Sequence, residues 1–583
     1  MTWTQVYDPL GHWWLSTLIA SLPIVFLLVL LAVFHVKPHW AALAGALAAV
    51  LAAIFVFRMP APLAGASFLY GVAFGLLKIA WIVVAAVFLY DIAVDTGQFE
   101  IMKRSVAAIT PDRRLQLLLV AFCFGAIIEG AAGFGAPVAI AGAFMIGLGF
   151  KPFHAAALNL IANTAPVAWG AIGTPVHTLA AVTGLPESDL NAMIGRILPF
   201  TAVIVSFWLV RAMVSWKETF EVLPAILVVG VSFAITQFLW SNFMDSNLVD
   251  IAAGAVSLIA TVGFLRIWQP KRIWRFEHDR AEMPIGHEVT REVTGGPMEV
   301  NFPMVVEDET VTPQLAVDTG LARYTTGQIA RAWLPFAILS VFVIVWGLPS
   351  VKTPMNKLTT PVWKVPVLHN AVTRAAPVVS KPTPEAAKYD FNWLTATGTG
   401  CFLAAIVAGL VLGMSLGRIL RVFGQTLYRM RYAVMAISCM LGLGYITRYS
   451  GMDAVLGLAF TRTGVLYPFF GTFLGWLGVA LTGSDTSSNA LFGSLQRITA
   501  QQLHLDPVLM AAANSAGGVM GKMIDAQSIT VATAATNQVG NEGIIFRFVL
   551  WHSVALASIV GVIVMLYAYV FPHLVPHGMH FVR

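Results

Sequence analysis

The stretch GAIIEGAAGFGAP, residues 125–137, lies between two apolar runs and has no polar loop around it. It places one glutamate and four glycines where hydrocarbon is expected to be the solvent. An ionisable group at membrane depth costs about 2.5–3.5 kcal/mol on insertion scales and is usually kept for a function. The stretch therefore predicts a backbone that turns inside the membrane, where irregular chain is tolerated only if it is buried in protein or lines a wet cavity.

The composition around this stretch is that of a polytopic membrane protein. Hydrophobic residues make up 58% of the 583 residues, charged residues only 11%, and the mean hydropathy is +0.78; soluble domains carry about 25% charged residues. The net charge of +6 comes from basic residues in short loops, as membrane orientation requires, so we expect no nucleic-acid partner. A GxSxG match at residues 413–417 lacks the strand-turn-helix context of a hydrolase, and metal and nucleotide motifs are missing. We expect neither a cofactor nor enzyme activity.

Apolar runs long enough to cross a ~30 Å core predict about twelve full transmembrane helices. They lie near residues 13–36, 39–57, 66–93, 153–184, 194–214, 222–240, 247–268, 331–349, 392–415, 430–447, 508–538 and 546–571. The expected layout is an N-terminal membrane half (1–268), a polar cytoplasmic loop (269–330), one transmembrane helix (331–349), a polar Pro- and Lys-rich loop (350–390) and a C-terminal membrane half (391–583). Neither polar stretch shows a convincing core, so both are expected to be surface excursions or partly ordered loops.

Two regions do not fit a simple crossing. The apolar runs 115–128 and 138–149 have 14 and 12 residues, so each rises only ~18–21 Å as a helix and falls short of the core. They fit as the two arms of a re-entrant hairpin (115–150) whose tip is EGAAGFGAP. A second hairpin (465–500) is expected around TGSDTSSN, residues 482–489.

The distribution of Lys and Arg gives an independent indication, because these residues mark the cytoplasmic side. The assignment that places most basic loops inside puts both termini, and also the loop 350–390, on the periplasmic side. It requires the segment 115–150 to return to the side that it left. A re-entrant hairpin does so, and two complete crossings would do the same less economically.

An internal repeat appears when the sequence is shifted by 355 positions, which lays residues 150–170 over 505–525. The same shift carries Glu129 and Gly130 onto Ser484 and Asp485, so the two hairpin tips correspond. With the charge-derived orientation the repeats are inverted, an architecture of secondary transporters whose site lies between the repeats. The expected fold is therefore an all-α, inverted-repeat membrane protein with two re-entrant hairpins and two interrupted helices, 153–184 and 508–538.

Three motifs suggest a family: IIEGAAGFGAPVAI (127–140), NTAPVAWGAIGTPV (163–176) and LTGSDTSSNALFG (481–493). Together they resemble the L-lactate permease family, and the resemblance covers nearly the whole chain. It implies proton-coupled symport of L-lactate, and often glycolate, across the bacterial inner membrane. A glycolate-preferring permease, a sodium-coupled carboxylate symporter and an anion channel remain open alternatives, and the oligomeric state is not indicated.

Candidate substrate-binding residues gather at the hairpin tips and the helix breaks. An unwound tip exposes backbone N–H groups beside the positive end of the next helix, where a carboxylate fits, although glycines also serve close helix packing. Lys522 is a candidate partner for the substrate carboxylate, but an ion pair with Asp525 one turn away is equally ordinary. The candidates are Gly130, Gly133, Gly135, Thr174, Ser484, Asp485, Ser487, Asn514, Lys522 and Gln527.

Three residues are candidates for carrying the coupled proton: Glu129, His177 and Asp525. Glu129 leads because it is an ionisable residue within an apolar segment; the alternative is that it merely caps the hairpin at the interface. His177 lies just after the break GAIGTP (170–175), where it would relay protons or simply pack.

Overall fold

The computed structural model describes residues 2–32, 34, 36–133, 136–276, 324–347, 349–379, 381–536, 538 and 541–579. Its α-helices are α1 (Trp13–Ala32), α2 (Pro38–Phe55), α3 (Ala61–Phe74), α4 (Trp81–Asp95), α5 (Gln98–Ala107), α6 (Arg113–Leu117), α7 (Gly125–Ala131), α8 (Ala136–Gly147), α9 (Pro152–Ala162), α10 (Gly170–Thr183), α11 (Glu187–Met213), α12 (Trp216–Glu221), α13 (Leu223–Phe243), α14 (Val249–Ile267), α16 (Thr326–Gly347), α17 (Pro349–Thr359), α18 (Thr397–Val411), α19 (Leu416–Ser450), α20 (Met452–Phe460), α21 (Tyr467–Thr482), α22 (Asp485–Gln502), α23 (Pro507–Gly521), α24 (Ala526–Ala535) and α25 (Glu542–Tyr569). The strands are β1 (Trp3–Thr4), β2 (Val362–Lys364), β3 (Val372–Arg374), β4 (Thr383–Pro384) and β5 (Lys388–Asp390).

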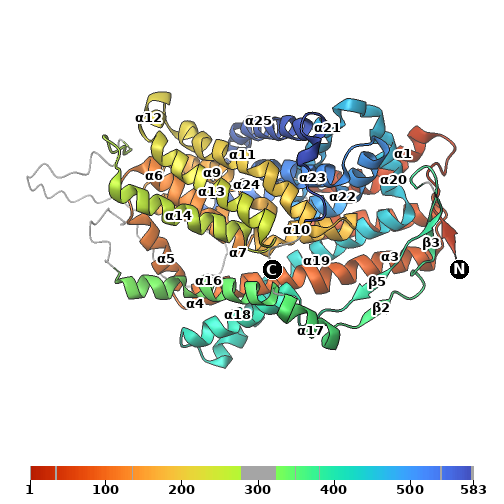
Figure 1. Ribbon diagram of the computed structural model, residues 1–583, viewed down its shortest axis with the longest axis horizontal. Coiled ribbons are helices and arrows are strands. Elements are labelled where there is room, and N and C mark those ends of the chain that lie inside the picture. Colours follow the sequence, from red (N-terminus) through yellow and green to blue (C-terminus); the bar gives the residue numbers. More distant parts are fainter. Residues whose placement is uncertain are drawn as a thin grey trace, which may run out of the picture.

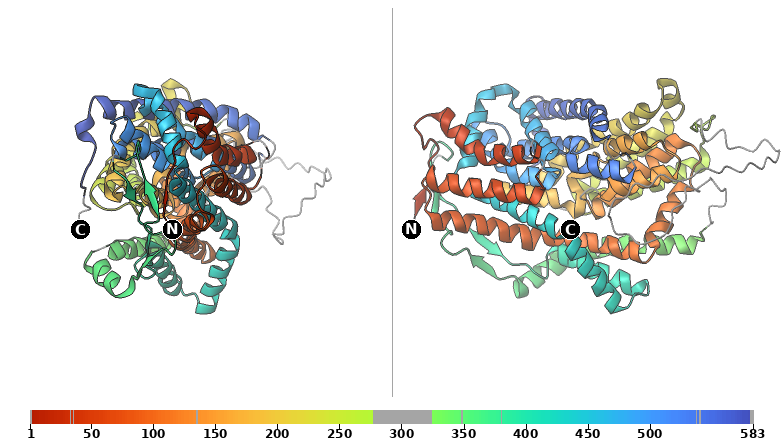
Figure 2. Two further views of the ribbon diagram at one scale, coloured as in Figure 1. Left: turned by 90° about the vertical axis from the view of Figure 1, so that its right-hand side faces the viewer. Right: turned by 180° about the vertical axis from the view of Figure 1, so that it is seen from behind.

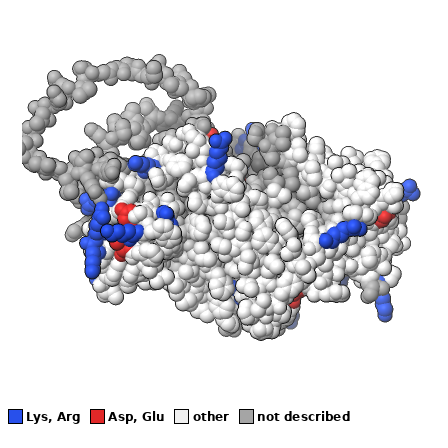
Figure 3. Space-filling model, turned by 90° about the horizontal axis from the view of Figure 1, so that it is seen from above, with Lys and Arg blue, Asp and Glu red and all other residues white. Residues whose placement is uncertain are grey.

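The helices run mostly along the long axis of the molecule, as two views show (Figures 1 and 2). Within the described ranges, nine helices are long and apolar enough to cross a membrane, or ten if one bent pair counts as a span, and three shorter apolar helices accompany them. Large apolar side chains stay exposed at helical spacing, such as Leu18, Leu22 and Phe26 on α1. In Figure 3 most of the middle of the visible face is free of charge. The prediction of an all-α polytopic membrane protein is confirmed.

The first arm of the hairpin is longer than the 14-residue run that we expected. One helix extends from Arg113 to Ala131, 19 residues, with a π-helical stretch at Leu118–Phe124; it is long and apolar enough to cross a membrane, so its length no longer argues for a re-entrant turn. The apolar run itself begins only after Arg113 and Arg114. Arg114 is nevertheless fully buried, since it pairs with Asp112 at 2.7 Å and with Glu221 of α12 at 2.8 Å. A satisfied guanidinium can lie inside the fold. The chain then turns after the arm, and α8 packs back against it.

The helix pairs α7–α8 and α21–α22, which form the two hairpins, each lie beside an interrupted helix. Both interruptions were predicted from the sequence, within 153–184 and 508–538. The α9–α10 pair is bent by 63° across residues 163–166. The second interruption lies between α23 and α24, where Asp525 has an extended backbone after one 3₁₀ turn. Asn159 of α9 donates to the Val138 carbonyl of α8 at 2.6 Å, and Asn514 of α23 donates to Asn489 of α22 at 2.9 Å. Each asparagine thus ties the broken helix to the second arm of its own hairpin.

The polar segment 350–390 is more ordered than expected. It forms α17 and four of the five strands; β1 pairs with β3 in parallel, β3 with β4 and β2 with β5 in antiparallel. Glu385 pairs with Arg374 of β3 at 2.7 Å within the segment, and it connects the segment to α19 through Arg448 at 2.6 Å. The β1–β3 pairing also places this segment on the same side of the molecule as the N-terminal strand, whereas most of the predicted loop 269–330 (residues 277–323) lies outside the described residues.

Candidate functional site

A small buried cavity lies where the two hairpins meet the two helix breaks. In Figure 1 the helices that surround it, α7, α10, α22 and α23, lie between the end with α6 and α12 and the end with the strands. The cavity measures about 30 Å³, room for about one or two waters. Its lining is Glu129, Gly133, Val167, Gly170, Ala171, Thr174, Pro175, Gly483, Ser484, Asp485, Thr486 and Lys522. Six residues predicted from the sequence are therefore brought together in one place.

Glu129 reaches the cavity from the last turn of α7. Its Oε1 atom lies 2.5 Å from the point where Gly170 would carry a Cβ, so the carboxylate lies directly over the first residue of α10. Among the described residues its Oε2 atom has no hydrogen-bond partner, although the side chain is 3% exposed. Buried acceptors in proteins are nearly always paired. The Oε2 atom of this carboxylate is therefore available to bind a proton, a water or a ligand.

Lys522 supplies the positive charge of the cavity. Its Nζ donates to the Gly483 carbonyl at the second hairpin tip at 2.6 Å and lies 3.4 Å from Asp525. Asp525 also caps α24, since its Oδ1 accepts from the Ser528 backbone at 2.7 Å. The expected ion pair one turn apart is thus present, and it holds the ammonium group at the tip rather than away from the cavity.

The backbone at the first helix break is strained. Ala171, Ile172 and Gly173 all have left-handed conformations, with φ of 45°, 58° and 71°. A left-handed β-branched residue is unusual, and such residues cost about 1–3 kcal/mol each. Gly133 at the first tip also has positive φ, and a Cβ there would lie 3.0 Å from the Ala171 Cβ. The first tip and the start of α10 are therefore in close contact, with no room for a side chain at Gly133.

At the second tip, Gly483 is left-handed (φ 72°) and Ser484 caps α22 by accepting from the Ser487 backbone at 3.3 Å. Asp485 follows, buried, and its Oδ2 accepts from Ser515 at 2.5 Å and from Asn489 at 3.2 Å. Its Oδ1 has no partner in the described part of the chain. Asp485 therefore lies at an ordinary helix start, and its Oδ1 atom remains available to accept a hydrogen bond.

Contacts at the cavity join α10 to α22. The Thr174 hydroxyl lies 3.4 Å from that of Thr486, and Asn489 donates to the Pro175 carbonyl at 3.2 Å. Hydroxyl groups such as those of Thr174 and Thr486, which line the cavity, can both donate and accept hydrogen bonds.

Several predicted residues lie elsewhere. His177 does not line the cavity: its ring lies 3.1 Å from Glu187 and 2.9 Å from the Asn247 side chain. Gly130 packs against α14, and Ser487 and Asn514 are buried behind the cavity wall. Gly135 and the side chain of Gln527 lie outside the described residues.

Asp250 was not predicted. It lies in the first turn of α14, is fully buried, and has no partner for either oxygen within the described ranges. A Cβ on Gly130 would lie 2.9 Å from the Asp250 Cβ, so this carboxyl group lies against the residue next to Glu129. Its signal in the sequence was a single acidic residue inside the predicted helix 247–268.

Comparisons with known proteins agree with one another. The family model described as L-lactate permease matches residues 16–571. The chain is 47% identical to the glycolate permease GlcA of Escherichia coli K12, covering 98% of this chain and 99% of that protein. It is 46% identical to an L-lactate permease of Salmonella typhimurium (98% and 100%) and 42% identical to one of Bacillus subtilis (99% and 100%). A solved efflux pump of Neisseria gonorrhoeae, MtrF, is only distantly similar (10% identity, TM-score 0.41, 86% of this chain and 83% of that chain covered).

Proposed function

This chain belongs to the L-lactate permease family, and from that premise we propose that it imports L-lactate and related 2-hydroxy monocarboxylates by proton symport with alternating access. Its relatives are named for lactate or for glycolate, so both anions are candidate substrates. The location would be the bacterial inner membrane, with several helices spanning it. The chain would act as a carrier and not as an enzyme.

One observation carries the proposal: a single small cavity holds both the carboxylate of Glu129 and the ammonium group of Lys522. A substrate carboxylate would bind Lys522, which already reaches the second tip through the Gly483 carbonyl. The substrate hydroxyl would pair with hydroxyls such as that of Thr174. Glu129 would take the coupled proton, because a neutral Glu129 no longer repels the incoming anion.

The size of the cavity supports alternating access. A volume of about 30 Å³ suits one or two waters and not a three-carbon acid, so substrate binding requires the walls to separate. The strained break at Ala171 and Ile172 faces the first tip through Gly133. Strain of this kind is relieved by a change of backbone conformation, which makes the break a natural moving part.

The equivalent helix breaks support an inverted repeat. The shift of 355 carries Gly170, the first residue of α10, onto Asp525, directly before α24. Inverted repeats of this type surround a central site and exchange access by rocking of one part against another. We propose a periplasmic location for both termini and for the strand-bearing segment paired with β1.

Uptake by proteoliposomes tests this function. Lactate and glycolate would be offered in competition under a proton gradient alone and a sodium gradient alone. The proposal expects saturable, proton-driven accumulation with counterflow. A sodium requirement would favour the alternative in which the free oxygen of Asp485, with Ser515 and Asn489 beside it, helps to bind a cation. Uptake without saturation or counterflow would indicate a channel.

A further inference from the structure

The buried carboxyl group of Asp250 has no task in the mechanism above. We propose that Asp250 is a second proton-binding site, which exchanges its proton during the transport cycle together with Glu129. The inference rests on the proposed proton symport and adds to it a second ionisable group. The ligand of the site is the proton itself, taken from water on one side of the membrane and released to water on the other.

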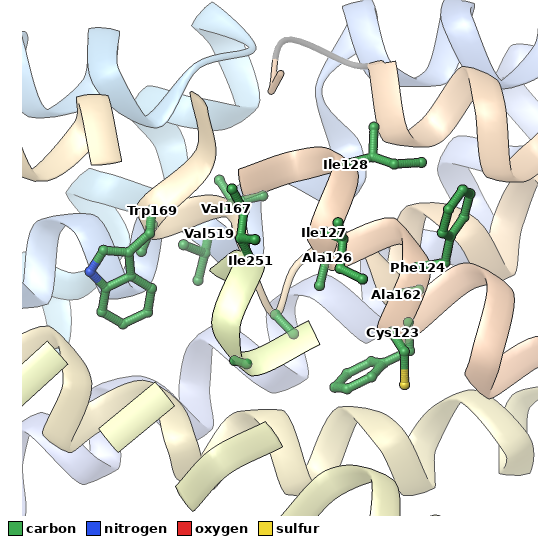
Figure 4. Packing of buried hydrophobic residues seen from close by; sticks show 14 of the residues in the cluster. Cys123, Phe124, Ala126, Ile127, Ile128, Ala162, Val167, Trp169, Ile251 and Val519 are labelled. Carbon is green, nitrogen blue, oxygen red and sulfur yellow. The ribbon is translucent and has the colours of Figure 1, made fainter. Parts of the chain in front are cut away.

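The position of Asp250 follows from the way α14 crosses the first hairpin arm. The two helices run antiparallel and approach each other through small residues, and the spacing of three and four residues on each helix keeps one face against the other. Figure 4 shows the apolar side chains of this region, including Ile127 and Ile251. The matched contacts are Cys123 with Ser257 (3.4 Å), Ile127 with Gly254, and Gly130 with Asp250.

This crossing fixes Asp250 beside the tip. A Cβ on Gly130 would lie 2.9 Å from the Asp250 Cβ and 3.0 Å from the Ile251 backbone nitrogen, so no side chain separates Asp250 from the arm. Glu129 is the neighbouring residue in the chain, and consecutive Cα atoms are ~3.8 Å apart. Two carboxyl groups therefore flank the same turn of α7, one directed to the cavity and one held at the α14 interface.

Among the described residues, no group of opposite charge contacts the Asp250 carboxyl; His177, whose ring lies 2.9 Å from the Asn247 side chain, is paired with Glu187. The helix α13, which packs along α14, contains no acidic, basic or histidine residue. Residues 118–131 of the arm contribute only Glu129 and the thiol of Cys123 as titratable groups. Asp245, in the loop before α14, uses its Oδ1 to accept from the Asn247 and Leu248 backbones at 2.6 and 2.9 Å. Of these groups, Glu129 is the one next to Gly130, which contacts Asp250, and an ionised Glu129 has the same sign of charge as an ionised Asp250.

These surroundings favour the protonated form of Asp250. An ionised carboxylate without hydrogen bonds or a counter-ion is strongly destabilised inside a protein, and it usually takes up a proton instead. The N-terminal end of α14 favours negative charge, but that effect is smaller than the loss of solvation. When Glu129 gains or loses its proton, the like-charge repulsion on Asp250 changes, so the two groups titrate as a coupled pair.

If Glu129 and Asp250 both exchange protons, the number of protons transported with each lactate depends on both residues. With both carboxyls present, the number of protons moved per lactate includes a contribution from Asp250. Asp250→Asn keeps the shape and neutral charge of the protonated residue but cannot exchange the proton. With a pH difference of one unit, each proton that is lost from the stoichiometry lowers the lactate accumulation ratio about tenfold.

The experiment measures proton and lactate uptake together in proteoliposomes of the full chain. Asp250→Asn is expected to keep counterflow, lower the proton-to-lactate ratio, and remove one step from the pH profile of uptake. Asp250→Glu should restore the ratio at least in part. Asp91→Asn, which changes a carboxylate that is paired with Arg429 at 2.5 Å and does not line the cavity, is the matched control and should leave the ratio unchanged.

The outcomes separate the two proposals. If wild-type protein moves no protons with lactate, the proposed symport itself fails. If wild-type protein does so and Asp250→Asn keeps the same ratio and pH profile, only the second proton site is overturned. Should Asp250→Asn fail to insert, wild-type protein is treated with a hydrophobic carbodiimide, which modifies protonated buried carboxyls, and is analysed by mass spectrometry. An adduct on Asp250 that declines as pH rises supports the site. An unmodified Asp250 overturns it.

Discussion

The carboxylate of Glu129 occupies the space that a side chain on Gly170 would need, with Oε1 2.5 Å from the ideal Cβ position. The acidic residue of the first hairpin tip and the first residue of α10 are thus fitted to each other. Because Gly170 directly precedes the left-handed residues Ala171, Ile172 and Gly173, any movement of these residues changes the surroundings of Glu129. This contact links the proton-binding group to the part of the backbone that carries the strain.

Gly170→Ala is expected to reduce lactate uptake by at least about tenfold, since its new methyl group would displace the Glu129 carboxylate, and ~1.4 kcal/mol already corresponds to a factor of ten. Initial uptake rates in proteoliposomes provide the measurement. Gly263→Ala is the matched control, because Gly263 lies inside α14 with nothing within 4 Å of its Cβ position. Equal, unimpaired rates for both variants would contradict the importance of the contact.

Lys522→Gln is expected to raise the KM for lactate at least about tenfold, because the buried ammonium group is the cation available to the substrate carboxylate. Competition assays with lactate and glycolate should show the same loss for both anions, since both present a carboxylate. Lys78→Gln serves as the control: Lys78 pairs with Asp390 at 2.9 Å and does not line the cavity. An unchanged KM in the Lys522 variant would assign Lys522 a purely structural role.

Much of the fold follows from the sequence because lipid imposes a simple rule: apolar runs of sufficient length become helices. The tip glycines, the break at GAIGTP and the acidic residue Glu129 were visible for the same reason, as polar or flexible residues out of place in an apolar chain. The residue at which the first arm begins could not be predicted from the sequence. The burial of Arg114 depends on Asp112 and on Glu221, which is distant in the sequence.

The candidate site was only partly predictable. Glu129, Asp485 and Lys522 were found by their motifs and do line one cavity. The sequence could not show that His177 pairs with Glu187, since that contact depends on how α10 and α11 pack. Asp250 was missed because its significance arises from missing partners, a property of the folded protein and not of any local pattern.

The segment 350–390 gives a prediction about stability. Burial alone would raise the pKa of Glu385, but Arg448 and Arg374 outweigh it and hold that pKa below its ordinary value. A depressed folded pKa stabilises the protein above the ordinary carboxyl pKa, and the contribution is lost as pH falls through the folded value. Glu385→Gln is therefore expected to lower the free energy of unfolding by about 2–4 kcal/mol near neutral pH, since both arginines keep some contact with water.

Thermal unfolding in detergent tests this stability prediction. The difference in melting temperature between wild type and Glu385→Gln should shrink as pH falls below the ordinary carboxyl pKa, and it should vanish only below the depressed folded pKa, where Glu385 is protonated in both states. Asp390→Asn is the control in the same segment, because its side chain is 55% exposed and its pair with Lys78 should contribute little. A difference that stays constant down to the lowest pH would contradict the role of the charge on Glu385.

The most direct test of proton coupling by Glu129 is the transport behaviour of Glu129→Gln in proteoliposomes. The account predicts that this variant, which retains the shape of the side chain but cannot exchange a proton, still performs lactate counterflow and no longer accumulates lactate against its gradient when a proton gradient is imposed. Proton-driven uphill accumulation at the wild-type level would show that Glu129 does not carry the coupled proton.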